Sequence, residues 1–148
     1  MIKRLILTAL AFLVVWAMVK KAKVFIDGVF DPIIKKMASA IQTFEGYYPG
    51  SRSYRNNNPG NLKFAGQSGA IGQDETGHAV FAYYDEGWAA LIHQLKLAFY
   101  GGSRVYGLQD TLYSFFGKYA EGNTVEYAEF VAGRLGVDPG ATLETMRG

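Results

Sequence analysis

The chain has 148 residues and a formal net charge of +2, with 49% hydrophobic and 15% aromatic residues and no cysteine. This length suits one domain with an appendage. The small charge and the lack of a basic stripe argue against nucleic-acid binding. Disulfides and thiolate sites are excluded, and the two histidines, His78 and His93, do not share a metal-ligand spacing. We therefore expect no metal site, and nothing in the sequence implies an organic cofactor.

The chain begins with an apolar segment between basic flanks. Residues 5–19 are almost entirely apolar, and three lysines follow them at once. At about 1.5 Å per residue the run is short for a hydrocarbon core of about 30 Å, but lysine side chains can reach outward to the membrane surface. A cleaved signal peptide is the alternative, and the lysines and the lack of a clean cleavage site count against it. We predict a single-pass membrane anchor over residues 1–23 and a linker over residues 24–31.

Helical patterns dominate residues 32–148, which we expect to form one folded domain. The Asp-Pro pair at 31–32 predicts a helix start, apolar residues recur at helical spacing up to Phe44, and Gly46 predicts the stop. The Gly-rich segment 62–84 predicts a small hairpin or sheet. Later helices are predicted to start at Asp85, Asp110 and Thr124, with a short last helix after Asp138-Pro139. The expected class is a mainly helical α+β domain with a small β element after its first helix.

Glu45 is the main candidate for chemistry, although an ordinary solvated glutamate is the alternative. A carboxylate in the last turn of a helix faces the negative end of the helix dipole, and the aromatic residues beside it could desolvate it further. Both effects raise the pKa of a carboxyl group, as a general acid requires at neutral pH. Arg52 and Arg55 lie close in sequence and could oppose this increase.

A polar loop with the sequence YRNNNPGN follows at residues 54–61. Asn-Pro-Gly is a strong turn signal, so a plain tight turn is one interpretation. Three consecutive asparagines exceed what a turn needs, however. Amide groups both donate and accept hydrogen bonds, which suits sugar hydroxyl and N-acetyl groups, and Gln67 extends this supply.

A glycosidase usually needs a second carboxylate at a spacing that its mechanism sets. The candidates are Asp74, Glu75, Asp85 and Glu86. Asp85 is better explained as a helix cap, either Asp74 or Glu75 in the Gly-rich region could face the cleft, and we choose Asp74 as the possible second acid. A lytic transglycosylase can work with one acid/base carboxylate, because a hydroxyl of the substrate closes the ring. The lack of an obvious second acid slightly favours that reaction.

Four segments of the chain together resemble the phage-type peptidoglycan-cleaving domain of the lysozyme superfamily. They are FEGYYPGSRSYRNNNPGNLKF at 44–64, GQD at 72–74, VFAYYDEGWAAL at 80–91 and LYSFFGKYAEGNTVEYAEFVAGRLGV at 112–137. The resemblance covers residues 41–137, and EG followed by RNNNPGNL is its most specific part.

The resemblance implies a lysozyme-like fold that cuts the glycan strand between N-acetylmuramic acid and N-acetylglucosamine. Glu45 matches the catalytic glutamate of the family. The expected substrate-binding residues are Tyr54, Arg55, Asn58, Asn61, Gln67 and Tyr119. The segment 119–127 would form the opposite wall of the cleft. No second catalytic acid is matched, so muramidase and lytic transglycosylase both remain open.

Together with the apolar segment, the resemblance implies a membrane-held lytic enzyme of a bacterial virus. Its domain would face the cell wall, either from the virion membrane or from the host inner membrane. The expected partners are peptidoglycan, the lipid bilayer through residues 5–19 and other virion proteins. A non-catalytic peptidoglycan-binding or structural membrane protein of a virion is the alternative.

Overall fold

The computed structural model describes residues 12–19 and 31–147, and the chain divides into two units before Pro32. Residues 12–19 are helical, and most of their large apolar side chains are exposed. Within these described ranges, no helix has the length and apolar character that crossing a membrane requires. The remainder of the predicted anchor, at 1–11 and 20–23, and residues 24–30 of the predicted linker lie outside the described residues. The membrane anchor therefore stays a prediction.

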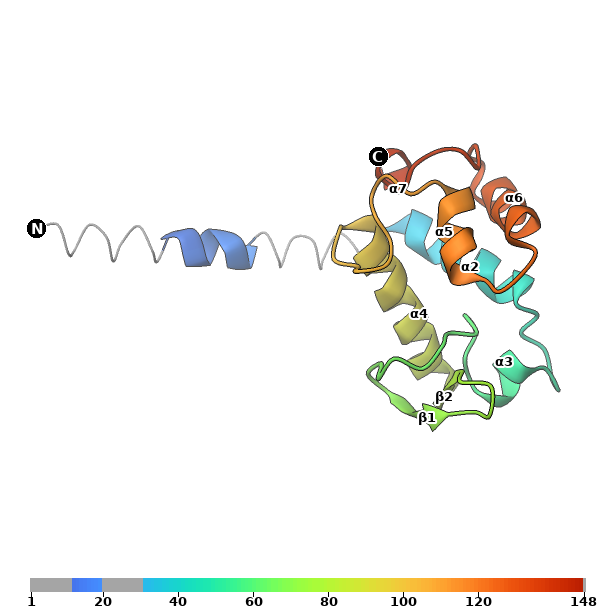
Figure 1. Ribbon diagram of the computed structural model, residues 1–148. Coiled ribbons are helices and arrows are strands. Elements are labelled where there is room, and N and C mark those ends of the chain that lie inside the picture. Colours follow the sequence, from blue (N-terminus) through green and yellow to red (C-terminus); the bar gives the residue numbers. More distant parts are fainter. Residues whose placement is uncertain (1–11, 20–30, 148) are drawn as a thin grey trace, which may run out of the picture. The chain divides into compact units, whose positions relative to one another are not determined.

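The second unit is mainly helical and contains one two-stranded antiparallel sheet (Figure 1). Its elements are α2 (Pro32–Phe44), α3 (Arg52–Arg55), β1 (Ala70–Gln73), β2 (Ala79–Phe81), α4 (Tyr84–Phe99), α5 (Leu112–Tyr119), α6 (Thr124–Leu135) and α7 (Leu143–Arg147). The predicted class, mainly helical with a small β element after the first core helix, is confirmed. Gly46 and Gly136 follow α2 and α6 with positive φ angles of 69° and 71°, which a glycine adopts without strain.

Three predicted helix starts are wrong by one or two residues. Tyr83, Thr111 and Asn123 occupy the N-cap positions, where Asp85, Asp110 and Thr124 were predicted. At α4 the carboxylate of Glu86 accepts a hydrogen bond of 3.2 Å from the backbone N–H of Tyr83, so Asp85 is not needed as a cap. Asp110 instead accepts a hydrogen bond from the Nζ atom of Lys118 at 2.6 Å.

Aromatic packing joins the end of α2 to α5 and α6. The ring of Tyr127 on α6 stacks on Phe44 at a centroid distance of 3.9 Å and on Phe116 of α5 at 4.1 Å. Such ring pairs contribute about 0.5–1.5 kcal/mol beyond their buried area. The stack fixes the place where α2 ends, and therefore the place of Glu45, relative to α6.

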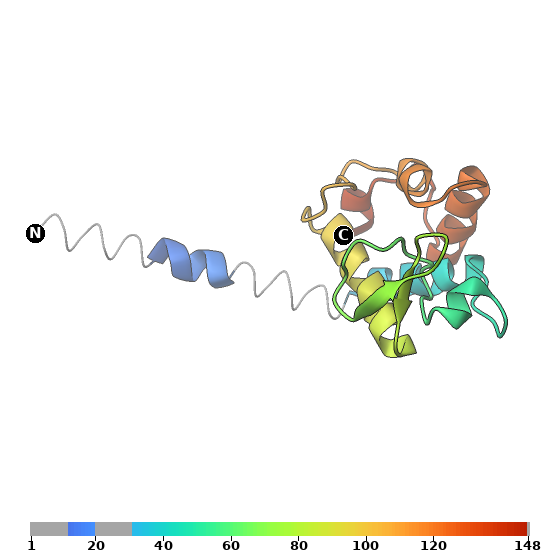
Figure 2. The same ribbon diagram turned by 60° about the horizontal axis from the view of Figure 1, so that its bottom comes forward.

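The hairpin and the asparagine loop lie at one end of α4, and α7 lies at the other (Figures 1 and 2). Strands β1 and β2 are antiparallel, with an irregularity between Ala70 and Gly72. The loop approaches α4 so closely that a Cβ atom at Gly87 would lie 1.9 Å from the carbonyl oxygen of Asn57. Glycine at this point of α4 is therefore what allows the loop to pack there.

Candidate active site

A polar cavity of about 460 Å³ lies between the asparagine loop and the segment that joins α5 to α6. This volume falls in the range of small-molecule sites, about 300–1,000 Å³. Its polar lining comes from both sides: Glu45, Arg52, Asn61, Lys63, Gln67, His78 and Gln94 on one, and Lys118, Tyr119, Glu121, Asn123 and Tyr127 on the other. The segment 119–127, which was predicted to face the loop, does contribute to this lining.

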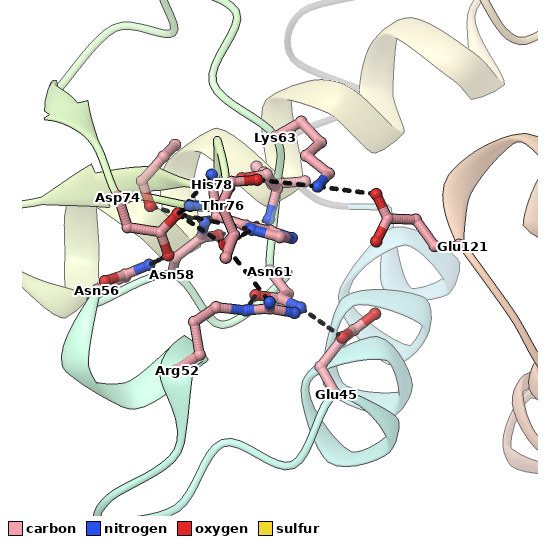
Figure 3. A network of polar contacts seen from close by, with 12 residues as sticks. Glu45, Arg52, Asn56, Asn58, Asn61, Lys63, Asp74, Thr76, His78 and Glu121 are labelled. Carbon is pink, nitrogen blue, oxygen red and sulfur yellow. Dashed lines mark hydrogen bonds and ion pairs between the residues drawn. The ribbon is translucent and has the colours of Figure 1, made fainter.

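Glu45 is the first residue after α2, and its backbone N–H still donates to the carbonyl of Ile41 at 2.9 Å. Its side chain is partly buried and lines the cavity, and Figure 3 shows it beside Asn61 and Arg52. Burial raises the pKa of this carboxyl, and the hydrogen bonds from Tyr127 and Asn61 and the charge of Arg52 offset only part of the increase. Glu45 therefore keeps its proton to a higher pH than an ordinary glutamate.

Each carboxyl oxygen of Glu45 accepts one hydrogen bond from a side chain far away in the sequence. The hydroxyl of Tyr127 donates to Oε1 at 2.9 Å, and the Nδ2 atom of Asn61 donates to Oε2 at 3.1 Å. Burial raises the pKa of Tyr127 far above its ordinary value, so this hydroxyl remains a donor. A carboxyl group offers about four acceptor positions, so capacity for a transferable proton remains.

Arg52 determines how the amide of Asn61 is turned. Its Nε atom donates to the Oδ1 atom of Asn61 at 3.1 Å, so the Nδ2 end of the amide must face Glu45. Asn61 has a positive φ of 48°, a left-handed conformation that asparagine tolerates better than most residues. The loop geometry and the arginine together aim one amide donor at the candidate acid.

Asp74, the predicted second acid, braces the hairpin turn and does not line the cavity. Its carboxylate accepts hydrogen bonds from Asn56 Nδ2 at 2.7 Å, from the hydroxyl and backbone N–H of Thr76 at 2.8 and 2.9 Å, and from the backbone N–H of His78 at 2.9 Å. Burial favours a higher pKa, but these hydrogen bonds outweigh it and leave the pKa of Asp74 far below its ordinary value. The carboxylate is used in holding the turn, and the structure places Asp74, the predicted second acid, outside the cavity lining.

The structure places Asn58, one of the predicted sugar-binding residues, inside the loop and outside the cavity lining. Its side chain has no exposed surface. Its Nδ2 atom donates to the carbonyls of Leu62 and Ala79, each at 2.9 Å, and its Oδ1 atom accepts from the N–H of Leu62 at 2.9 Å. The side-chain amide takes the place of backbone hydrogen bonds inside the loop, so it is not available to bind a ligand.

The other predicted binding residues divide into two groups. Tyr54 and Arg55 do not line the cavity: the tyrosine ring packs against Tyr47, and the arginine donates to the carbonyl of Gly50 at 2.5 Å. Gln67 and Tyr119 do line it, although the Tyr119 hydroxyl is held by the carbonyl of Gly60 at 2.5 Å. Of the six predicted substrate-binding residues, the cavity therefore contains Asn61, Gln67 and Tyr119.

Several residues that act on Glu45 or face it have no individual role predicted from the sequence. Tyr127 and Arg52 act on Glu45 directly or through Asn61, and the sequence suggested Arg52 only as a charge that might lie nearby. Lys63 and Glu121 form an ion pair of 2.8 Å between the two sides of the cavity. Glu121 and Tyr127 both fall within the predicted cleft wall at 119–127, which was the available signal for them.

In the described ranges, no group of three or more acidic or histidine side chains is arranged to hold a metal ion. Compared with family models, curated proteins and solved structures, the chain shows no match in any of the three. What the site can do is therefore argued from its own residues. It presents a carboxyl group of raised pKa, a second carboxylate paired with Lys63, neutral amide and hydroxyl groups and further cationic side chains in an open polar cavity.

Proposed function

We propose that the domain cleaves the glycan strand of peptidoglycan at the bond between N-acetylmuramic acid and N-acetylglucosamine. Glu45 acts as the general acid and gives its proton to the bridging oxygen as the bond breaks. The observation that carries the proposal is the placement of Glu45, partly buried at the end of α2, between two neutral donors and inside an open cavity.

The electrostatics of the site support an acid that keeps its proton to a higher pH than an ordinary glutamate. Burial raises the pKa of the Glu45 carboxyl, and the hydrogen bonds from Tyr127 and Asn61 hold its two oxygens in a defined orientation. When the proton leaves, the same two donors stabilise the carboxylate that forms. This combination lets one group release its proton during bond cleavage and take it back afterwards.

The remaining lining supports a neutral, hydroxyl-rich ligand. Asn61 and Arg52 both have N–H groups beyond those used within the protein, and Gln67 adds a second amide on the same side of the cavity. The lysozyme-like pattern of the sequence, EG followed by RNNNPGNL, points to the same substrate. Through its apolar segment at 5–19 the chain would be held in the virion membrane or the host inner membrane, which raises the concentration of the domain beside the cell wall.

The test compares the wild type with Glu45→Gln on purified peptidoglycan, followed by clearing and by mass spectrometry of the products. Loss of a general acid should lower the rate by about 10²–10⁴-fold. Glu75→Gln is the control, because Glu75 is exposed and lies outside the cavity. Clearing by Glu45→Gln at the wild-type rate would contradict the proposal. Binding of peptidoglycan by the wild type without any product would indicate the non-catalytic alternative.

A further inference from the structure

The cavity contains a second carboxylate that the sequence pattern does not single out. Glu121 lies in the segment between α5 and α6 and lines the same cavity as Glu45, on the opposite side from the asparagine loop. Figure 3 shows the Glu45 and Glu121 side chains facing a common space, with Lys63 beside Glu121. Among the aspartates and glutamates of the described ranges, only Glu45 and Glu121 line this cavity.

Lys63 pairs with Glu121 from the other side of the cavity. Its Nζ atom lies 2.8 Å from the Oε1 atom of Glu121 and also donates to the carbonyl of Thr76 at 3.2 Å. The Glu121 side chain is 77% exposed, so its free oxygen remains accessible to water and to a ligand. A carboxylate that is both positioned by a cation and open to solvent can receive a proton from a water molecule in the cavity.

The surroundings shift the pKa values of the two carboxyl groups in opposite directions, as a general acid and a general base require. The hydrogen bond and the charge of Lys63 lower the pKa of Glu121, and the more distant charges of His78 and Arg52 act in the same direction. Burial raises the pKa of Glu45. Lys118, the remaining cation of the cavity lining, is paired with Asp110 at 2.6 Å. Between the two pKa values Glu45 is protonated while Glu121 is ionised, which is the pairing of a general acid with a general base.

We propose that Glu121 is the second carboxylate of the site and acts as the general base for an attacking water molecule. The inference rests on the proposed function and specifies its reaction as hydrolysis by single displacement. The water oxygen forms a bond to the anomeric carbon while the bond from that carbon to the bridging oxygen breaks. Glu45 gives its proton to the bridging oxygen, Glu121 takes a proton from the water, and solvent returns that proton to Glu45. One water molecule is consumed for each bond that is cleaved.

This assignment has two consequences for the products. Water as the nucleophile gives ordinary reducing ends, whereas attack by a substrate hydroxyl gives anhydro ends. Attack on the face opposite the leaving group also inverts the configuration at the anomeric carbon. Enzymes of this kind separate their two carboxyl groups by about 6.5–9.5 Å to leave room for the water. A site in which the two groups stand on opposite sides of a 460 Å³ cavity provides such room.

The experiment uses the full chain with Glu121→Gln, and Glu75→Gln as a control with the same change of charge at an exposed position outside the cavity. We expect Glu121→Gln to lower kcat/KM by about 100-fold, the control to match the wild type, and the wild type to release reducing ends of inverted configuration. Anhydro ends or retained configuration in the wild type, or a loss in Glu121→Gln of less than about threefold, would overturn the role of Glu121.

A second variant, Lys63→Met, tests the assignment through the pH profile. The acidic limb of kcat/KM should report the group that must be ionised, and removal of Lys63 raises the pKa of Glu121, so this limb should move to higher pH. An acidic limb that stays in place would overturn the assignment. If the wild type cleaves nothing, or Glu45→Gln cleaves normally, the proposed function fails and this inference fails with it. If only Glu121→Gln behaves as the wild type, the proposed function stands and this inference fails.

Discussion

Substitution of Gly87 by alanine tests whether the close packing of the asparagine loop on α4 builds the site. The added Cβ atom would lie 1.9 Å from the carbonyl oxygen of Asn57 and 3.0 Å from the Cδ atom of Pro59. Real Cβ atoms almost never come closer than 3.0 Å to another heavy atom. The loop or the helix must therefore move away by about 1 Å, so the substitution overpacks the contact between them.

The expected change in the free energy of unfolding of Gly87→Ala follows from two opposing contributions. Overpacking costs typically about 1–3 kcal/mol, and a clash with a backbone atom belongs at the upper end of that range. Alanine is better than glycine inside a helix by about 1 kcal/mol. The expected net loss is about 2 kcal/mol, or a fall in Tm of roughly 5–15 °C for a domain of this size. Because Asn61 belongs to the same loop, a shift of about 1 Å should also lower the rate of glycan cleavage, by up to about 100-fold.

Thermal unfolding followed by circular dichroism measures the first effect, and the rate of peptidoglycan clearing below the transition measures the second. Gly133→Ala is the matched control, because Gly133 lies inside α6 and a Cβ atom added there would meet no other atom within 4 Å. This control should gain about 0.5–1 kcal/mol and keep full activity. Equal or higher stability of Gly87→Ala, relative to the wild type, would refute the packing argument.

Two further substitutions test the polar contacts. Asn58→Ala removes three buried hydrogen bonds to backbone groups and should destabilise the domain by about 3 kcal/mol, measured by urea unfolding; a loss of activity with unchanged stability would contradict its structural role. Tyr127→Phe keeps the ring stack but removes a donor that lowers the pKa of Glu45, so this pKa rises and the alkaline limb of the activity profile should move to higher pH. Tyr106→Phe is its control, because that buried tyrosine lines the cavity without bonding to Glu45. An alkaline limb that moves to lower pH in Tyr127→Phe would contradict the expected direction of the pKa change.

Much of the local structure follows from short-range signals in the sequence. The Asp-Pro pair at 31–32 marks the start of α2, and Gly46 and Gly136 follow the ends of α2 and α6 with the positive φ angles that glycine permits. These outcomes depend on a few neighbouring residues, so no tertiary contact is needed to foresee them. The starts of α4, α5 and α6 were misplaced by one or two residues because several residues near each start can occupy the N-cap position.

The asparagine loop shows where such reasoning stops. Asn58 and Asn61 carry the same side chain three residues apart, yet one is buried among backbone groups and the other donates to Glu45. Their local sequence offers the same amide chemistry at both positions. What separates them is the path of the loop against α4 and the hairpin, which Gly87 permits.

The sequence by itself determined the mainly helical class, the small hairpin and the position of one carboxyl group at the end of a helix. Only the tertiary structure decided which side chains surround that carboxyl. Tyr127 reaches Glu45 across 82 positions of the chain, and Lys63 meets Glu121 from the other side of the cavity. Helix ends are governed by contacts over one turn, whereas an acid–base site is assembled from contacts between distant segments. The aromatic stack of Phe44, Tyr127 and Phe116 is what brings those segments together.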